Sequence, residues 1–180
     1  MKSDSASSRR PSKWRLSKTL KRNVSYRPIE DDDMKYVWAA YKKGALSTMN
    51  VFPPDLPADE FKRAFEEYVL GNFNAAWMLI APTDKGQLPV GVVFAAWAPN
   101  APYMIVTGMC WFPWASKRNH VEAMVCFLSG VRKEFALMFY ALKEHKRLYE
   151  VCAMHGIVHR VGTSYTAIPG QSAAVFETKT

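Results

Sequence analysis

The sequence predicts one α+β (α/β-type) domain, residues 25–180, behind a basic extended N-terminal arm, residues 1–24. Its mixed central sheet has about seven strands and is flanked by four helices. Three observations predict this. The chain has 180 residues, a length typical of one domain. Its 49% hydrophobic and 22% charged residues are the composition of a globular protein with a core. Strand-like and helix-like apolar spacings also succeed one another after residue 25.

A short strand at 25–29 and two helices begin the domain. The first helix starts at an acidic turn, 31–33, whose charges suit a helix N-terminus, and ends at two lysines before Gly44. The second lies between a proline-rich loop, 53–57, and Gly71. Both have an apolar stripe at helical spacing, made of Met34, Val37, Trp38 and Tyr41 in the first and of Phe61, Phe65 and Tyr68 in the second.

Three strand-like runs follow and predict an antiparallel meander. A third helix is expected to begin at Asn119 as N-cap, with Glu122 as its capping-box partner. The last elements are a strand, a fourth helix that stops at Gly156, and a hairpin over Pro169 and Gly170. The expected ranges are 75–81, 90–97 and 103–111 for the meander, 136–142 for the next strand, 143–155 for the fourth helix, and 157–165 and 172–178 for the hairpin.

Most of the net charge lies in the arm. Residues 1–25 carry eight basic side chains and one acidic one, whereas the rest of the chain carries 16 basic and 15 acidic ones. The formal charge of +8 therefore divides into +7 and +1. Such an arm can bind phosphates or dock on a protein, and its tryptophan could stack on a base or fill an apolar pocket. The candidate contact residues are Arg9, Arg10, Lys13, Trp14, Arg15, Lys18, Lys21 and Arg22.

Several classes of protein and site are excluded by what the sequence lacks. Cys110, Cys126 and Cys152 are odd in number, lie in apolar runs and form no Cys-x-x-Cys pair. This argues against a disulfide framework and a metal site and favours buried, reduced thiols in the cytoplasm. No run is long and apolar enough for a membrane span or a signal peptide.

The order of the expected elements resembles the GNAT superfamily of N-acetyltransferases over residues 25–178. Two segments look like GNAT-like proteins of tailed phages: Trp-Phe-Pro-Trp-Ala-Ser-Lys-Arg-Asn at 111–119 and His-Gly-Ile-Val-His-Arg-Val-Gly-Thr at 155–163. Some members of that group are enzymes and others are virion components of short-tailed phages. The resemblance implies that the fourth and fifth strands splay apart, which in the superfamily admits the pantetheine of acetyl-CoA.

In the superfamily, the loop after the fourth strand holds the pyrophosphate of acetyl-CoA and has glycine or another small residue at two positions. The resemblance places Ser116 at the first position of this motif and Asn119 and Val121 at the small ones. A branched valine stands where the cofactor approaches, so the motif is degenerate. Lys117 and Arg118 could neutralise phosphate through their side chains, or they could form an ordinary solvated turn.

The resemblance also implies a carboxylate or an ordered water near the fourth strand and a tyrosine near the end of the fourth helix. Residues 103–112 include no acidic side chain, and Glu122 is the nearest candidate, with helix capping as its other role. Cys152 occupies the tyrosine's place, and Tyr149 lies one turn earlier. Tyr149 could donate a proton to the leaving thiolate or simply pack in the core.

Two functions therefore remain open. The degenerate loop favours a virion component that binds no cofactor, located in the virion and the host cytoplasm, whose arm docks on other virion proteins or on packaged DNA. The alternative is an active acetyl-CoA-dependent N-acetyltransferase that modifies a host protein or a small amine. For the first function, Trp114 with Phe112 is the expected exposed apolar contact point.

Overall fold

The computed structural model describes residues 23–46, 52–73, 75–141, 143–165 and 172–178. The candidate contact residues of the arm and the expected turn at Pro169 and Gly170 lie outside the described residues.

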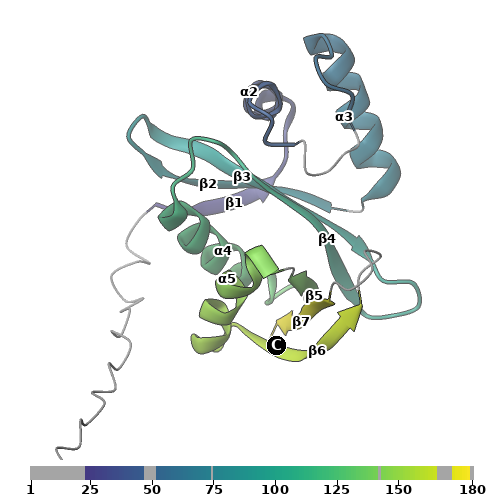
Figure 1. Ribbon diagram of the computed structural model, residues 1–180, viewed down its shortest axis with the longest axis vertical. Helices are drawn as coiled ribbons and strands as arrows, with labels where there is room; N and C mark the ends of the chain where they lie inside the picture. The colour runs from purple at the N-terminus through teal and green to yellow at the C-terminus, as the bar shows by residue number, and fades with distance from the viewer. Residues whose placement is uncertain (1–22, 47–51, 74, 142, 166–171, 179–180) are drawn as a thin grey trace, which may run out of the picture.

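Seven strands form one mixed sheet at the centre of the domain (Figure 1). They are β1 (Ser25–Pro28), β2 (Ala75–Thr83), β3 (Gly86–Trp97), β4 (Tyr103–Trp111), β5 (Ala136–Ala141), β6 (Val158–Tyr165) and β7 (Ser172–Thr178). The order across the sheet is β1-β2-β3-β4-β5-β7-β6. Every neighbouring pair is antiparallel except β4 and β5, which are parallel.

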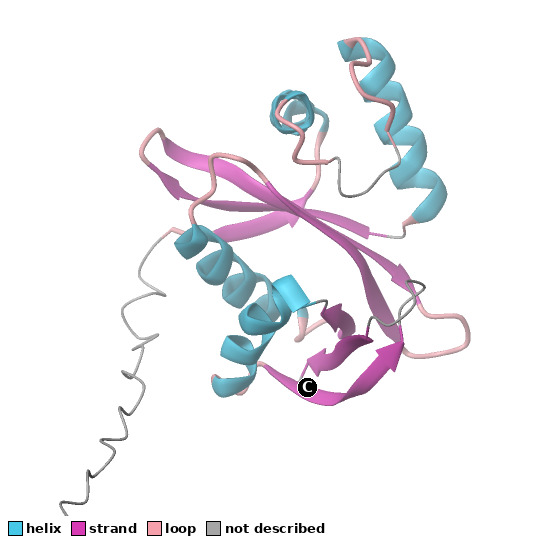
Figure 2. Ribbon diagram, in the orientation of Figure 1, coloured by secondary structure: helices cyan, strands magenta, loops and turns pink. Residues whose placement is uncertain are grey.

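In the described part of the chain, four helices cover the sheet, two on each face (Figure 2). They are α2 (Met34–Lys42), α3 (Ala58–Asn72), α4 (Lys117–Val131) and α5 (Lys143–Met154), and a 3-10 turn, η1 (Asp31–Asp33), precedes α2. The predicted α+β architecture, with a mixed sheet of seven strands and four helices, is confirmed. Its strand and helix bounds agree with the predicted ones to within a few residues, because the apolar spacings that predict them are local.

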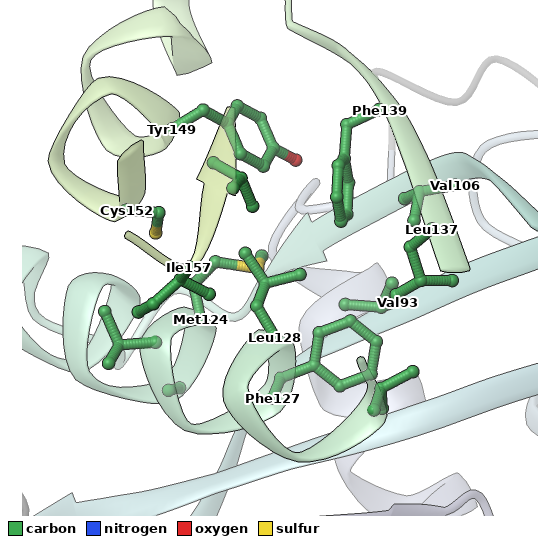
Figure 3. Close-up of a cluster of buried hydrophobic side chains, with 14 of the residues drawn as sticks. Val93, Val106, Met124, Phe127, Leu128, Leu137, Phe139, Tyr149, Cys152 and Ile157 are labelled. Carbon is green, nitrogen blue, oxygen red and sulfur yellow. The ribbon is translucent and has the colours of Figure 1, made fainter. Parts of the chain in front are cut away.

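Each face of the sheet has its own hydrophobic core. Helices α2 and α3 bury an aromatic cluster around Phe61, Phe65 and Phe94. Helices α4 and α5 bury a second cluster that includes Phe127, Leu128 and Val93 (Figure 3). Because β2 and β3 lie between the two cores, both faces of these strands are buried along most of their length. This burial explains their nearly continuous apolar sequence.

Two local predictions are wrong. Helix α4 begins one turn earlier than expected, because Ser116 and not Asn119 is its N-cap, and Asn119 takes the place that was assigned to Glu122 in the capping box. Trp114 is not an exposed contact point with Phe112. Phe112 is buried, and the indole N–H of Trp114 donates to the carbonyl of Pro89 at 2.7 Å.

Candidate functional site

Strands β4 and β5 separate part-way along their length. They pair only from Tyr103 opposite Ala136 to Val106 opposite Phe139, although β4 continues to Trp111. The β3–β4 register also skips Thr107, which marks a bulge at the point of separation. Along residues 107–111, β4 therefore has β3 on one edge and no described strand on the other. Backbone groups on such a free edge are available to hydrogen-bond an extended ligand.

Five residues, 112–116, separate helix α4 from β4, and a reciprocal cap fixes the start of the helix. The Ser116 hydroxyl accepts from the Asn119 N–H at 3.1 Å, and the Asn119 carboxamide oxygen accepts from the Ser116 N–H at 2.9 Å. The Asn119 amide also donates to the carbonyl of Pro82 at 2.9 Å, which ties the helix start to the end of β2. Ser116 and Asn119 thus position the turn, and Lys117 and Arg118 are its exposed cations.

Two further residues that were predicted for this site, Val121 and Glu122, point toward the protein interior. Val121 packs against the core beneath α4. Glu122 is buried and forms an ion pair with Arg118, one turn earlier on the helix. The structure therefore brings Ser116, Lys117, Arg118 and Asn119 together at the start of α4 and holds Glu122 beside them as a charge partner. A helix N-terminus with two added cations is a favourable environment for phosphate.

Trp111 lies at the end of the free edge of β4, and the sequence did not single it out as part of the candidate site. Its ring stacks on His120 with centroids 4.3 Å apart, at the last position of β4. A side chain on Gly91, its partner on β3, would collide with the Trp111 ring and with the carbonyl of Cys110, each 2.8 Å from the added carbon. A glycine inside a strand was the available signal for this close approach.

Tyr149 and Cys152 lie in the core and not on a surface. The Tyr149 ring packs between Phe139 and Phe176, with centroid distances of 5.2 and 5.6 Å, and Figure 3 shows it in the same cluster as Cys152. Burial raises the pKa of the Tyr149 phenol above its ordinary value and raises the pKa of Cys152 to about 12. A phenol in this environment is a poorer proton donor than one in water.

Cysteine alkylation should report this burial. Burial also raises the pKa of Cys110 to about 12. At pH 8, each of the two thiols, Cys110 and Cys152, is therefore ionised in about one molecule in ten thousand. We expect iodoacetamide to modify Cys110 and Cys152 at least about 100-fold more slowly in the folded protein than in denaturant, measured by peptide mass spectrometry. Equal rates in the two states would contradict the burial.

No disulfide joins the three cysteines, which are free, with Cys110 and Cys152 buried. The described residues contain no group of three or more His, Cys, Asp or Glu side chains arranged to hold a metal ion. None of the described helices has both the length and the apolar character needed to cross a membrane.

No protein-family model and no curated protein sequence matches the chain. Solved structures match it over most of its length. Spermidine N-acetyltransferase from Vibrio cholerae, solved with CoA and spermine, superposes with a TM-score of 0.57 at 13% identity and covers 86% of this chain and 94% of its own. A GCN5-related N-acetyltransferase from Brucella melitensis gives 0.58 at 15% identity and covers 86% and 75%. A GNAT-family acetyltransferase from Bacillus cereus gives 0.56 at 11% identity and covers 87% and 96%.

The chain has the GNAT fold. At identities of 11–15%, the likeness to these solved structures concerns the fold alone. All three of these similar structures are of bacterial proteins. The superfamily resemblance predicted that the fourth and fifth strands splay, and in this GNAT fold β4 and β5 do separate after four paired positions.

Proposed function

We propose that the protein is an acetyl-CoA-dependent N-acetyltransferase. The free edge of β4 at residues 107–111 is the observation that carries the proposal. Pantetheine is an extended chain with two amide groups, and an exposed strand edge offers backbone donors and acceptors at matching intervals. The exposed cations at the start of α4, Lys117 and Arg118, follow the end of β4 by six and seven residues, where the diphosphate of the same molecule would need them.

Bound acetyl-CoA supplies an activated acyl group that a neutral amine can attack. The chain contributes binding and polarisation. Backbone N–H groups on the free edge of β4 would stabilise negative charge on the thioester oxygen as it develops, the role of an oxyanion hole. Lys117 and Arg118 would neutralise the phosphates, while the Ser116–Asn119 cap keeps the turn in place. Among the solved structures, spermidine is the acceptor in the name of one enzyme, so a polyamine is the first amine to assay.

Calorimetric titration with acetyl-CoA tests the proposal. We expect saturable binding in the micromolar range for the wild type, and for Lys117→Ala a Kd about 5-fold higher at low salt, because one charge-assisted phosphate contact is lost. Lys133→Ala is the matched control, since Lys133 is an exposed lysine just beyond the other end of α4. No saturable heat for the wild type, or equal losses for both variants, would argue against this site.

A non-catalytic role is the second candidate, and a specific observation favours it. Tyr149 is buried in the core, and the resemblance to the superfamily puts buried Cys152 at the place of its catalytic tyrosine. The protein would then be a virion component whose basic arm docks on other virion proteins or on packaged DNA. Absence of acetyl-CoA binding together with presence in purified particles, detected by mass spectrometry, would support this candidate over the enzyme.

A further inference from the structure

The described chain begins beside the start of helix α4. The side-chain amide of Gln87, at the start of β3, donates to the carbonyl of Asn23. Gln87 pairs with Pro82 of β2, and the Pro82 carbonyl accepts from the amide of Asn119 in the first turn of α4 at 2.9 Å. Figure 1 shows the start of β1 next to the start of α4. The basic arm, residues 1–24, therefore joins the domain beside the first turn of this helix.

The last residue of the arm is held by α4 as well. The thiol of Cys126 donates to the carbonyl of Val24 at 3.3 Å, and Val24 packs against the core beneath the helix. Successive Cα atoms are about 3.8 Å apart, so covalent geometry keeps Arg22 and Lys21 within about 8 Å of Asn23. These two cations of the arm therefore belong to the same end of the domain as the start of α4.

Three exposed cations of the described domain lie near this junction. Lys85 is in the turn between β2 and β3, and Lys117 and Arg118 are in the first turn of α4. Two carboxylates oppose them: Asp84 is exposed and precedes Lys85 in the chain, and the buried Glu122 pairs with Arg118. Lys117 forms no ion pair with the described residues, so its ammonium is available to a phosphate. We call Lys21, Arg22, Lys85, Lys117 and Arg118 the cationic surface.

The arm carries more charge than one cofactor can neutralise. Seven Lys and Arg residues lie from position 9 to position 22, with no acidic residue among them. A chain of this length reaches up to about 45 Å, whereas the phosphates of acetyl-CoA belong to one nucleotide. A nucleic-acid backbone repeats its phosphates along its whole length, and each Lys or Arg near a phosphate adds affinity by releasing counterions. The charge of the arm therefore favours a nucleic acid as its partner.

We propose that the arm and the cationic surface together bind the phosphate backbone of duplex DNA, and that DNA bound there excludes acetyl-CoA. A duplex is the occupant because it has about one phosphate per 1.7 Å of its axis, and backbone contacts need no access to the bases. Lys117 is the shared residue, since the diphosphate of acetyl-CoA is placed on the same turn. The DNA contact goes beyond the proposed function, whereas the exclusion rests on it.

The salt dependence of DNA binding tests the surface without acetyl-CoA. The probe is a fluorescein-labelled duplex of about 20 base pairs, titrated with the full chain and followed by anisotropy between about 50 and 200 mM NaCl. We expect Lys117→Ala to reduce the slope of log K against log salt by about 0.9, and Lys21→Ala/Arg22→Ala to reduce it by about 1.8. Lys133→Ala, an exposed lysine beyond the other end of α4, should leave the slope unchanged.

Two outcomes would overturn this surface. If the wild type does not bind the duplex at about 50 mM salt, the arm serves a protein partner and the proposal fails. If Lys117→Ala keeps the wild-type slope while the double variant in the arm loses affinity, the arm binds DNA alone and the start of α4 takes no part.

Competition then separates the exclusion from the proposed function. Acetyl-CoA is titrated into the protein–DNA complex at constant ionic strength, with sodium sulfate as the ionic reference. We expect acetyl-CoA to release the DNA and sulfate to leave it bound. If calorimetry shows acetyl-CoA binding while the affinity for DNA stays unchanged, the exclusion is overturned and the proposed function stands. If acetyl-CoA does not bind at all, the proposed function fails, and the salt slopes still decide whether the surface binds DNA.

Discussion

Replacing Asp33 with alanine is expected to lower the free energy of unfolding by about 2–3 kcal/mol. Asp33 is 1% exposed, and its two carboxylate oxygens accept from the Arg27 guanidinium at 2.7 and 2.8 Å. It also accepts from the backbone N–H of Glu30 at 2.9 Å. The variant would remove the bidentate acceptor of a half-buried cation, which keeps only the Pro28 carbonyl at 3.1 Å and the Glu30 carboxylate at 3.4 Å, and would leave the Glu30 N–H without its acceptor. The expected loss is below that of a fully buried pair, because Arg27 retains 34% of its side-chain exposure.

Urea denaturation of matched variants measures this effect. Asp31→Ala is the control, since Asp31 is an exposed aspartate of the same 3-10 turn and should change stability by less than about 0.5 kcal/mol. The double variant Arg27→Met/Asp33→Ala should lose less than the two single losses combined, because the partners compensate each other. Strict additivity would show that the ion pair does not carry the effect.

Replacing Gly130 with alanine is expected to destabilise the domain by about 1–3 kcal/mol, although alanine normally stabilises a helix by about 1 kcal/mol relative to glycine. An added methyl group at Gly130 would overlap the phenol ring of Tyr26, which packs on α4 from β1. Tyr26 would have to leave this position, where its ring makes an edge contact with Phe127 at 5.3 Å.

Gly71 provides the matched comparison, because an added carbon there meets no atom within 4 Å near the end of α3. Gly71→Ala should raise the free energy of unfolding by up to about 1 kcal/mol. The clash should also be relieved in part by Tyr26→Val in the Gly130→Ala background. A Gly130→Ala protein at least as stable as the wild type in urea would contradict the packing of β1 on α4.

Local sequence patterns were sufficient for the element order, since each helix and strand follows from the spacing of its own apolar residues. The stripe from Met34 to Tyr41 and the glycines after the helices mark boundaries that the structure reproduces within a few residues. The start of α4 was misplaced because Ser116 and Asn119 are both good N-cap residues, and only the bond from Asn119 to the carbonyl of Pro82 on β2 distinguishes them.

The candidate site was harder to predict, because its parts come from separate segments. Lys117 and Arg118 could be placed at a helix start from the sequence. The point where β4 and β5 separate gave no local signal, since it depends on pairing between residues 33 positions apart in the chain, such as Tyr103 and Ala136. From the sequence, Tyr149 could either reach a leaving thiolate or pack in the core. Only its packing between Phe139 and Phe176 shows that it lies in the core.

The sequence by itself determined the α+β class, the order of the elements and the concentration of positive charge in the arm, because these depend on composition and short-range periodicity. The tertiary structure decided where β4 and β5 separate and which candidate residues are buried. Those properties arise from pairing and packing between distant segments, and side-chain alternation alone does not specify which strands meet.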